Sequence, residues 1–328
     1  MKVLVSGGAG FIGGHVVQQL VAAGARVAVI DDLSSGTRRN LRQAHQLGLA
    51  VDEVFATDVT KPDLRRLVDV WGPEVIVHLA AQADVRRSVQ DPLRDAHTNV
   101  LGTLNVLTTA VAAGVRKVVV ASSGGAVYGN LAHTAHTARE DHGLHPISPY
   151  GVSKAACDSY VEAFRQTTGL TATSLRIGNA YGLTAAGTPG SGVVSSFAMA
   201  LADSQRPVIF GDGTQTRDFV HVTDIARAFV SACTDGDHQI LNIASGLAHS
   251  IAGVLAAVSQ AFGTSPNPVY EAVKPGEVHR ICLDISRAER VLGWRPTVAL
   301  PEGIREIADQ LRSGAEPILT STSTQEGC

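Results

Sequence analysis

The chain has 328 residues, of which 45% are hydrophobic, so it is long enough to bury one large core or two fused ones. Its formal net charge of −3 gives no electrostatic reason to expect a nucleic acid or an anionic membrane as a partner. The four cysteines lie far apart without a C-x-x-C pair, which is not the pattern of a zinc site or a disulfide framework. No apolar run approaches the length of a membrane span, and we expect a cytoplasmic protein.

Short β-branched segments alternate with longer helical patterns in the first half of the chain. The patterns predict buried strands at residues 3–6, 26–31, 75–79, 117–122 and 172–177, with a further strand near 51–55. Helices are predicted at residues 11–23, 62–70, 95–113 and 149–167. Strands and helices that alternate in this way form right-handed crossovers, so we expect an α/β fold with a doubly wound parallel sheet.

The alternation ends after about residue 180. Gly, Ser, Thr and Pro dominate residues 183–192, and mixed helical and strand-like segments follow. We expect a large domain at 1–180 and a smaller α+β lobe at 181–313, with part of 218–248, including a helix at 224–233, returning to the large domain. Residues 314–328 are rich in Ser, Thr and Gly and are predicted to form a disordered tail.

A glycine string joins the first predicted strand to the first predicted helix. Gly7 allows a tight turn, Gly10 lets the backbone approach a pyrophosphate, and Gly13 lets helix and sheet pack closely. The N-terminus of the helix offers N–H groups to phosphates. Asp31, at the end of the next strand, would accept hydrogen bonds from the adenosine ribose hydroxyls, and Asp32 beside it favours NAD over NADP.

A second pattern lies at the start of the helix predicted at 149–167. Ser148 is a suitable N-cap and Pro149 a suitable first helical residue, so Tyr150 falls in the first turn. Lys154 follows four residues later on the same face. A phenol in water loses its proton near a pH of about 10, so a tyrosine that works as a base needs positive charge beside it. An ammonium one turn away and the helix N-terminus both supply that charge.

The spacing G-x-x-G-x-x-G together with Tyr150 and Lys154 resembles the short-chain dehydrogenase/reductase superfamily, whose nucleotide domain is a Rossmann fold. Further strings narrow the resemblance to its extended branch, the nucleotide-sugar epimerases and dehydratases. These strings are Asp58-Val59, His78-Leu79-Ala80-Ala81, Thr98 to Thr103, Ser122 to Gly129 and Gly211 to Val220. The resemblance covers about residues 1–310.

The resemblance implies a cofactor site and a substrate site. The residues implied to bind NAD are Gly7, Gly10, Phe11, Ile12, Gly13, Asp31, Asp32, Asp58, Val59, Leu79, Ala80, Ala81, Asn99, Tyr150 and Lys154. Those implied to bind the nucleotide-sugar substrate are Asn179, Arg217, Lys274 and Glu277. Arg217 suits a diphosphate because a guanidinium grips phosphate oxygens in a bidentate way, although it could instead pair with Asp218 or Asp224. Lys274 stands where many relatives have Arg. The lysine keeps the positive charge but lacks the paired N–H donors of a guanidinium.

The implied reaction is 4-epimerisation, most simply of UDP-glucose and UDP-galactose. Tyr150 as phenolate would remove the proton of the sugar 4-hydroxyl while hydride passes to NAD, and the 4-keto sugar would turn over and take the hydride back. Relatives carry a Ser or Thr hydroxyl at the position of Gly124, so Ser123 is expected to supply it, with Ser122 or a water as alternatives. The dehydratases carry an Asp-Glu pair where this chain has Gly125-Ala126, which favours epimerisation over dehydration.

Other interpretations stay open at this point. The substrate could be another nucleotide sugar, N-acetylated or a uronic acid, for a 4-epimerase or a reductase, or the chain could be a non-catalytic NAD-binding regulator. The resemblance also implies a homodimer that pairs through the helices predicted at 95–113 and 149–167. His133, His136, His142 and His145 are close in sequence, but they lack the spacing of a zinc site, and we expect no metal.

Overall fold

The computed structural model describes residues 1–41, 51–131 and 137–313. The predicted tail at 314–328 and two of the four neighbouring histidines, His133 and His136, lie outside the described residues. None of the helices in the described ranges is both long enough and apolar enough to cross a membrane.

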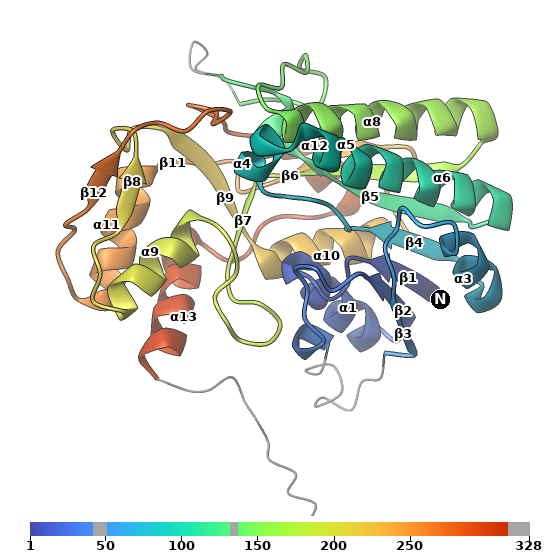
Figure 1. Ribbon diagram of the computed structural model, residues 1–328, viewed down its shortest axis with the longest axis horizontal. Coiled ribbons are helices and arrows are strands. Elements are labelled where there is room, and N and C mark those ends of the chain that lie inside the picture. Colours follow the sequence, from blue (N-terminus) through green and yellow to red (C-terminus); the bar gives the residue numbers. More distant parts are fainter. Residues whose placement is uncertain (42–50, 132–136, 314–328) are drawn as a thin grey trace, which may run out of the picture.

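A seven-stranded sheet in the order β10-β6-β5-β4-β1-β2-β3 forms the centre of the molecule (Figure 1). Its strands are β1 (Lys2–Ser6), β2 (Arg26–Asp31), β3 (Glu53–Ala56), β4 (Val75–His78), β5 (Lys117–Ser123), β6 (Thr171–Ile177) and β10 (Ile240–Ile243). Every neighbouring pair is parallel. The predicted doubly wound parallel sheet is therefore confirmed. The sequence patterns do not assign β10, whose four residues are too short to show a period.

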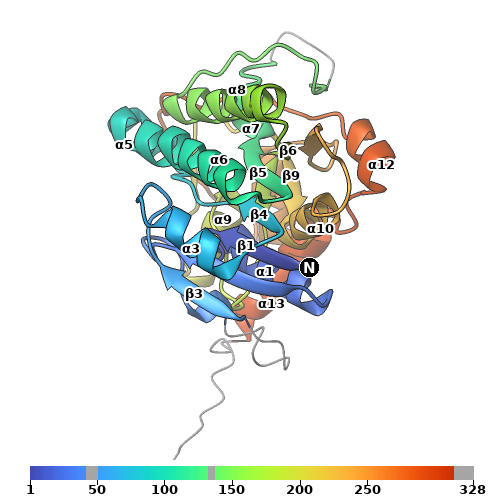
Figure 2. The same cartoon turned by 90° about the vertical axis from the view of Figure 1, so that its right-hand side faces the viewer.

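Helices cover both faces of this sheet (Figure 2). On one face α1 (Phe11–Ala22), α10 (Val222–Ala232) and α12 (Ser286–Leu292) share a buried apolar cluster with the strands. On the other face α3 (Leu64–Trp71), α6 (Gly102–Ala113) and α8 (Pro149–Thr168) share a second cluster. Strands covered on both faces are buried on both sides, which explains their continuous runs of Val and Ile.

The helix predicted at 95–113 needs correction. It begins three residues earlier as α5 (Pro92–Ala96), continues as a π-helical turn (His97–Leu101), and becomes α6 at Gly102. Asp91 starts it, because its carboxylate accepts a hydrogen bond from the Arg94 amide at 3.0 Å and Pro92 occupies the first helical position. Two short helices, α4 (Val85–Gln90) and α7 (Gly124–Val127), have no counterpart in the sequence patterns.

The remaining elements form a smaller lobe beside the carboxyl ends of the strands (Figure 1). One sheet contains β7 (Asn179–Tyr181), β9 (Thr216–His221) and β11 (Ala248–Ser250), and another pairs β8 (Val208–Phe210) with β12 (Val269–Glu271). The helices α9 (Val193–Ala202), α11 (Ile251–Phe262) and α13 (Leu300–Arg312) pack on each other through Phe197, Leu255 and Ile304. The domain boundary at residue 180 stays a prediction.

The segments that follow the adjacent strands β1 and β4 approach each other closely. Gly7 has a φ of +71°, and a Cβ placed on it would lie 2.6 Å from the Ala80 amide nitrogen that follows β4. A Cβ placed on Gly13 would lie 2.0 Å from the Gly7 carbonyl oxygen. Glycine is therefore required at both positions, one for the turn and one for the entry of α1.

Gly13→Ala is expected to lower the free energy of unfolding by about 3 kcal/mol or more, because the new methyl group meets backbone atoms that cannot move independently. Gly10→Ala is the matched control, since its Cβ would have only the Gly7 carbonyl oxygen within 4 Å, at 3.2 Å. Thermal and urea unfolding of the two variants measure the difference. An equal loss in both variants would contradict this account of the glycine turn.

Candidate active site

Asp31 holds the glycine loop in place. Its Oδ2 accepts a hydrogen bond from the Ala9 amide at 2.9 Å, and its Oδ1 accepts one from the Leu33 amide at 2.9 Å. Burial raises the pKa of this carboxyl, while the two amide donors act in the opposite direction. A carboxylate has about four acceptor positions, so Asp31 can still receive ribose hydroxyls. Asp32 instead accepts the Ser34 amide at 2.9 Å and closes the next turn.

The start of α1 is shaped for an anion. Gly10 is its N-cap, no side chain caps the first amides, and the space beside Gly10 is free of described atoms other than the Gly7 oxygen. Amides in that position are ready donors for phosphate oxygens. The Phe11 ring packs against the backbone of Gly190 from the smaller lobe, where an added Cβ would lie 2.4 Å from the ring. Ile12 packs against the core.

The other residues expected near the cofactor lie at the same edge of the sheet. Asp58 closes a turn by accepting the Thr60 amide at 2.8 Å, and Val59 is buried against Gly102. Leu79 and Ala80 follow directly after β4 and are half-buried, and the amide of Leu79 donates to the Ser6 carbonyl at 3.0 Å. These contacts place the backbone and leave the roles of the side chains toward NAD as predictions.

A buried chain of hydrogen bonds runs from the end of β1 to the π-helical turn. Ser6 Oγ lies 2.7 Å from His78 Nδ1, His78 Nε2 lies 3.1 Å from Thr103 Oγ1, and Thr103 donates to the Asn99 carbonyl at 2.7 Å. Because the Thr103 proton is used on Asn99, His78 Nε2 must donate and Nδ1 must accept. Burial, together with the charge of Lys154, lowers the pKa of His78 to about 3, so its ring is neutral.

Asn99 links this chain to the segment after β4. Its Oδ1 accepts the Gln82 amide at 2.8 Å, and its Nδ2 donates to the Gln82 carbonyl at 3.0 Å and to Asp95 Oδ1 at 3.1 Å. The other Asp95 oxygen accepts the Ser153 hydroxyl on α8 at 2.6 Å. The Asn99 side chain therefore fixes the backbone on which a cofactor would lie, with its own donors and acceptor engaged by the protein.

The helix that carries Tyr150 and Lys154 begins as predicted. Ser148 Oγ accepts the Gly151 amide at 3.1 Å and Pro149 occupies the first turn. The Lys154 side chain is 6% exposed, and its Nζ donates to the Ala121 carbonyl at 2.9 Å. No carboxylate among the described residues forms an ion pair with it. Tyr150 is half-buried and precedes Lys154 by four residues, so the two residues lie on the same face of α8.

The turn after β5 is closely packed around Gly124. A Cβ on Gly124 would lie 2.4 Å from Leu283 Cδ1 and 3.1 Å from the Arg176 carbonyl oxygen. Ser122 is 3% exposed and its Oγ has no partner among the described atoms. Ser123 is half-buried, and its Oγ lies 4.0 Å from a Cβ placed on Gly125. Of the two serines, Ser123 is therefore the more exposed.

Asn179, on β7, approaches this turn, and Arg217 lies on the neighbouring strand β9. Asn179 Oδ1 is buried without a partner among the described atoms and lies 3.3 Å from a Cβ placed on Gly125. Arg217 Nη1 donates to the Thr216 carbonyl at 2.9 Å. Burial lowers the pKa of the Arg217 guanidinium and nearby Glu277 acts against this. Asp218 accepts the Ser245 amide at 2.7 Å and Asp224 the Thr297 amide at 2.9 Å, so neither carboxylate is paired with Arg217.

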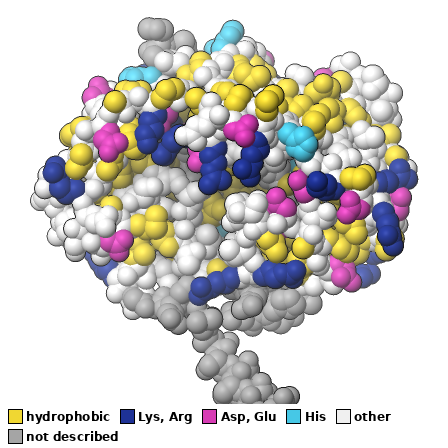
Figure 3. Space-filling model, viewed as in Figure 1, with side chains coloured by type: hydrophobic (Ala, Val, Ile, Leu, Met, Phe, Trp, Pro, Cys, Tyr) yellow, Lys and Arg dark blue, Asp and Glu magenta, His cyan; other side chains and the backbone are white. Residues whose placement is uncertain are grey.

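Lys274 lies over an aromatic ring. Its Nζ is 3.3 Å from the ring centroid of Phe210, and the guanidinium carbon of Arg86, on α4, is 5.5 Å from the same centroid. Figure 3 shows Lys and Arg side chains along one rim of a hollow between the lobes. Phe210 and Arg86 were not singled out from the sequence, because a cation–ring contact between distant segments leaves no local pattern.

Among the described residues, no group of three or more His, Cys, Asp or Glu is arranged to hold a metal ion. His142 and His145 are both exposed.

Comparison with known proteins gives full-length matches. The family model of GDP-mannose 4,6 dehydratase matches residues 4–307. The UDP-glucose 4-epimerase of Mycolicibacterium smegmatis is 40% identical over 317 residues, which are 96% of this chain and 100% of that protein. The UDP-glucose 4-epimerase of Thermotoga maritima, solved with UDP-glucose, has a TM-score of 0.89 and 36% identity, covering 96% of this chain and 99% of that one.

A second solved structure, the UDP-glucose 4-epimerase of Thermus thermophilus in complex with NAD, has a TM-score of 0.88 and 37% identity over 96% of this chain and 100% of that one. These matches cover both the large domain and the smaller lobe, since each solved structure spans 96% of this chain. At such identity and coverage, the chain belongs to the extended short-chain dehydrogenase/reductases, in their branch of nucleotide-sugar epimerases and dehydratases.

Proposed function

We propose that this protein is an NAD-dependent nucleotide-sugar 4-epimerase that interconverts UDP-glucose and UDP-galactose through a 4-keto sugar. The observation that carries the proposal is the pair on α8, where Tyr150 and the buried Lys154 share one face and Lys154 has no carboxylate partner among the described residues. The relatives named UDP-glucose 4-epimerase, one solved with UDP-glucose and one with NAD, support the substrate and the cofactor.

The residues at the sheet edge suit NAD. The open backbone at Gly10 and the first amides of α1 would receive the pyrophosphate, and Asp31 would receive the ribose hydroxyls. Lys154 has donors beyond the one given to Ala121, and they would reach the nicotinamide ribose. Bound there, NAD would supply the acceptor for the hydride from C4 of the sugar and the donor for its return, so the site would need no second redox partner.

In the proposed reaction Tyr150 moves the proton and the smaller lobe holds the substrate. The Tyr150 phenolate takes the proton of the 4-hydroxyl and gives it back after the sugar has turned over, while the Lys154 charge stabilises the phenolate. Neutral His78 adds no second positive charge there. Arg217 and Asn179 would hold the diphosphate, so the sugar can rotate while its nucleotide stays fixed.

Epimerisation fits this site better than the dehydration for which the matching family model is named. Dehydration needs an acid and a base for the protons at C5 and C6 of the sugar. The turn after β5 has Gly125 and Ala126 in the place where the resemblance puts those groups, and neither carries one. An intact Tyr150–Lys154 pair also speaks against a regulator that only binds NAD.

We also propose that the protein works in the reducing cytoplasm. Cys157, Cys233 and Cys282 are buried and take part in no disulfide among the described residues. Burial raises the pKa of Cys233 and of Cys282 to about 12, which keeps both thiols protonated and unreactive.

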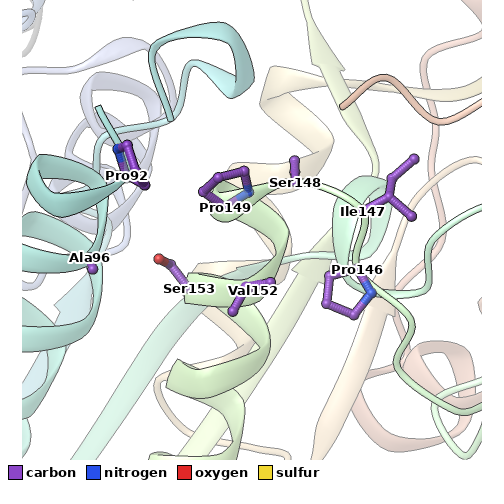
Figure 4. A pocket seen from close by; sticks show the side chains of 8 residues that line it. All are labelled: Pro92, Ala96, Pro146, Ile147, Ser148, Pro149, Val152 and Ser153. Carbon is purple, nitrogen blue, oxygen red and sulfur yellow. The ribbon is translucent and has the colours of Figure 1, made fainter. Parts of the chain in front are cut away.

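The helices expected at the dimer interface expose apolar side chains. Leu101 is 51% exposed, Val152 54% and Tyr160 40%, on neighbouring helical segments. Nearby, Pro92 and Ala96 face Pro149 and Ser153 across an apolar groove (Figure 4). We propose that a second copy of the chain covers this face in a four-helix arrangement, which would remove the exposed apolar surface from water.

Tyr150→Phe is expected to lower kcat for UDP-glucose about 100-fold or more, because the proposed proton acceptor for the 4-hydroxyl is lost. The assay follows UDP-galactose formation without added NAD, and UDP binding should be unchanged. Tyr160→Phe, on the same helix, is the control and should keep full activity. A Tyr150→Phe enzyme with normal kcat contradicts the proposal, and turnover of an N-acetylated or uronic acid substrate only would assign a different sugar.

Ser123→Ala is expected to lower kcat about 10-fold to 100-fold, whereas Ser122→Ala should leave kcat unchanged, because only Ser123 is open to the substrate. The Ser122 change also removes a buried hydroxyl without a described partner, so the melting temperature should not fall. Loss of activity in Ser122→Ala alone would move the role to Ser122. Full activity in both variants would leave a water as the bridge.

Leu101→Asp combined with Tyr160→Asp is expected to convert a dimer into a monomer of 34.2 kDa, because two charges would have to be buried in the interface. Light scattering after gel filtration measures the mass. Val70→Asp is the control, since Val70 is 79% exposed on α3 and lies outside the proposed interface. A wild-type monomer, or a double variant that stays dimeric, would contradict this interface.

A further inference from the structure

A loop of the smaller lobe reaches across to the large domain beside the proposed substrate site. Its residue Gly276 is seated between α4 and the start of α8, because a Cβ placed on it would lie 3.3 Å from Val89, 3.6 Å from Val85 and 3.2 Å from Ser148. Ser148 is the N-cap of the helix that carries Tyr150. The loop therefore connects the substrate lobe to both α4 and the catalytic helix.

The same loop and α4 place two cations on one ring. Lys274, two residues before Gly276, has its Nζ 3.3 Å from the Phe210 centroid, and Arg86 of α4 has its guanidinium carbon 5.5 Å from it. Phe210 is the last residue of β8, in the smaller lobe, whereas Arg86 belongs to the large domain. Arg86 thus reaches across the junction between the lobes, which Figure 1 shows beside α4.

These cations have no acidic partner within the described residues. Neither Arg86, Lys274 nor Arg217 forms an ion pair with a carboxylate there, although ion pairs are found elsewhere on the chain. A cation–ring contact at an exposed site is weaker than a hydrogen bond between two charged groups. A guanidinium can make two such hydrogen bonds to one phosphate. A diphosphate would therefore displace Phe210 as the partner of Arg86.

We propose that Arg86 is a substrate-binding residue. When substrate binds, Arg86 gives up its contact with Phe210 and binds the diphosphate of the nucleotide sugar, together with Lys274 and Arg217. This inference rests on the proposed function, because it assumes a nucleoside diphosphate in the hollow between the lobes. It adds a ligand from the large domain to a set that otherwise comes from the smaller lobe. Arg86 then ties the two lobes together over the sugar while the diphosphate is bound.

The test compares Arg86→Ala with Arg87→Ala in the full chain purified with its cofactor. Arg87 is the neighbouring exposed arginine and makes no described contact with Phe210, so it controls for net charge. Titration calorimetry with UDP should show about a tenfold weaker Kd for Arg86→Ala and an unchanged Kd for Arg87→Ala. The KM for UDP-glucose should rise by the same factor with kcat unchanged, and Arg86→Lys should recover part of the loss.

An unchanged Kd for UDP in Arg86→Ala overturns the inference, and so does a higher KM for UDP-glucose without weaker UDP binding, because Arg86 would then contact the sugar. A wild-type protein that binds UDP without epimerising UDP-glucose would contradict the proposed function alone, and the UDP comparison would still decide the role of Arg86. If the wild-type chain binds none of UDP, TDP and GDP, both proposals fail. Melting temperatures verify that both variants are folded.

Discussion

The site depends on one close approach, between the end of β1 and the end of β4. These are adjacent parallel strands, paired from Val3 with Val75 to Ser6 with His78, so their carboxyl ends meet at one edge of the sheet. The turn at Gly7 passes within van der Waals contact of the Ala80 backbone, and α1 starts against the same turn through Gly13. Glycine, the smallest residue, at each of these points brings the uncapped start of α1 beside the segment that follows β4.

A buried chain of hydrogen bonds connects this edge of the sheet to the helices that flank it. Ser6, His78 and Thr103 connect β1, β4 and α6, and Thr103 ends on the carbonyl of Asn99 in the π-helical turn. Asn99 then fixes Gln82, and Asp95 reaches Ser153 on α8. Because His78 is neutral and buried, it adds hydrogen bonds without adding charge. The proposed action of the Lys154 charge on Tyr150 is therefore not accompanied by a second charge from His78.

Sequence reasoning reached the parts of this site that are set by local rules. The end of β1, the glycine turn and the start of α8 at Ser148 and Pro149 follow from strand runs, glycine spacing and capping, each within a few residues. The π-helical turn does not follow from these local rules, because its side chains, such as Asn99, form hydrogen bonds with a distant part of the backbone. For the same reason, β10 and the contact of Arg86 with Phe210 could not be predicted from the sequence, because both depend on segments that come together only on folding.

Gly124 shows how a local absence can have a distant cause. The space that a side chain at Gly124 would need is filled by Leu283, which is fully buried. Leu283 is held there by its amide, which donates to Asp218 Oδ2 at 3.1 Å, and Asp218 is the residue next to Arg217 on β9. Asp218 also binds the Ser245 amide at 2.7 Å, so its position is set from two sides. One buried carboxylate therefore couples the strand of the proposed diphosphate-binding arginine to the turn after β5. A hydroxyl at position 124 would require this packing to change, whereas the neighbouring half-buried Ser123 carries its hydroxyl without that change.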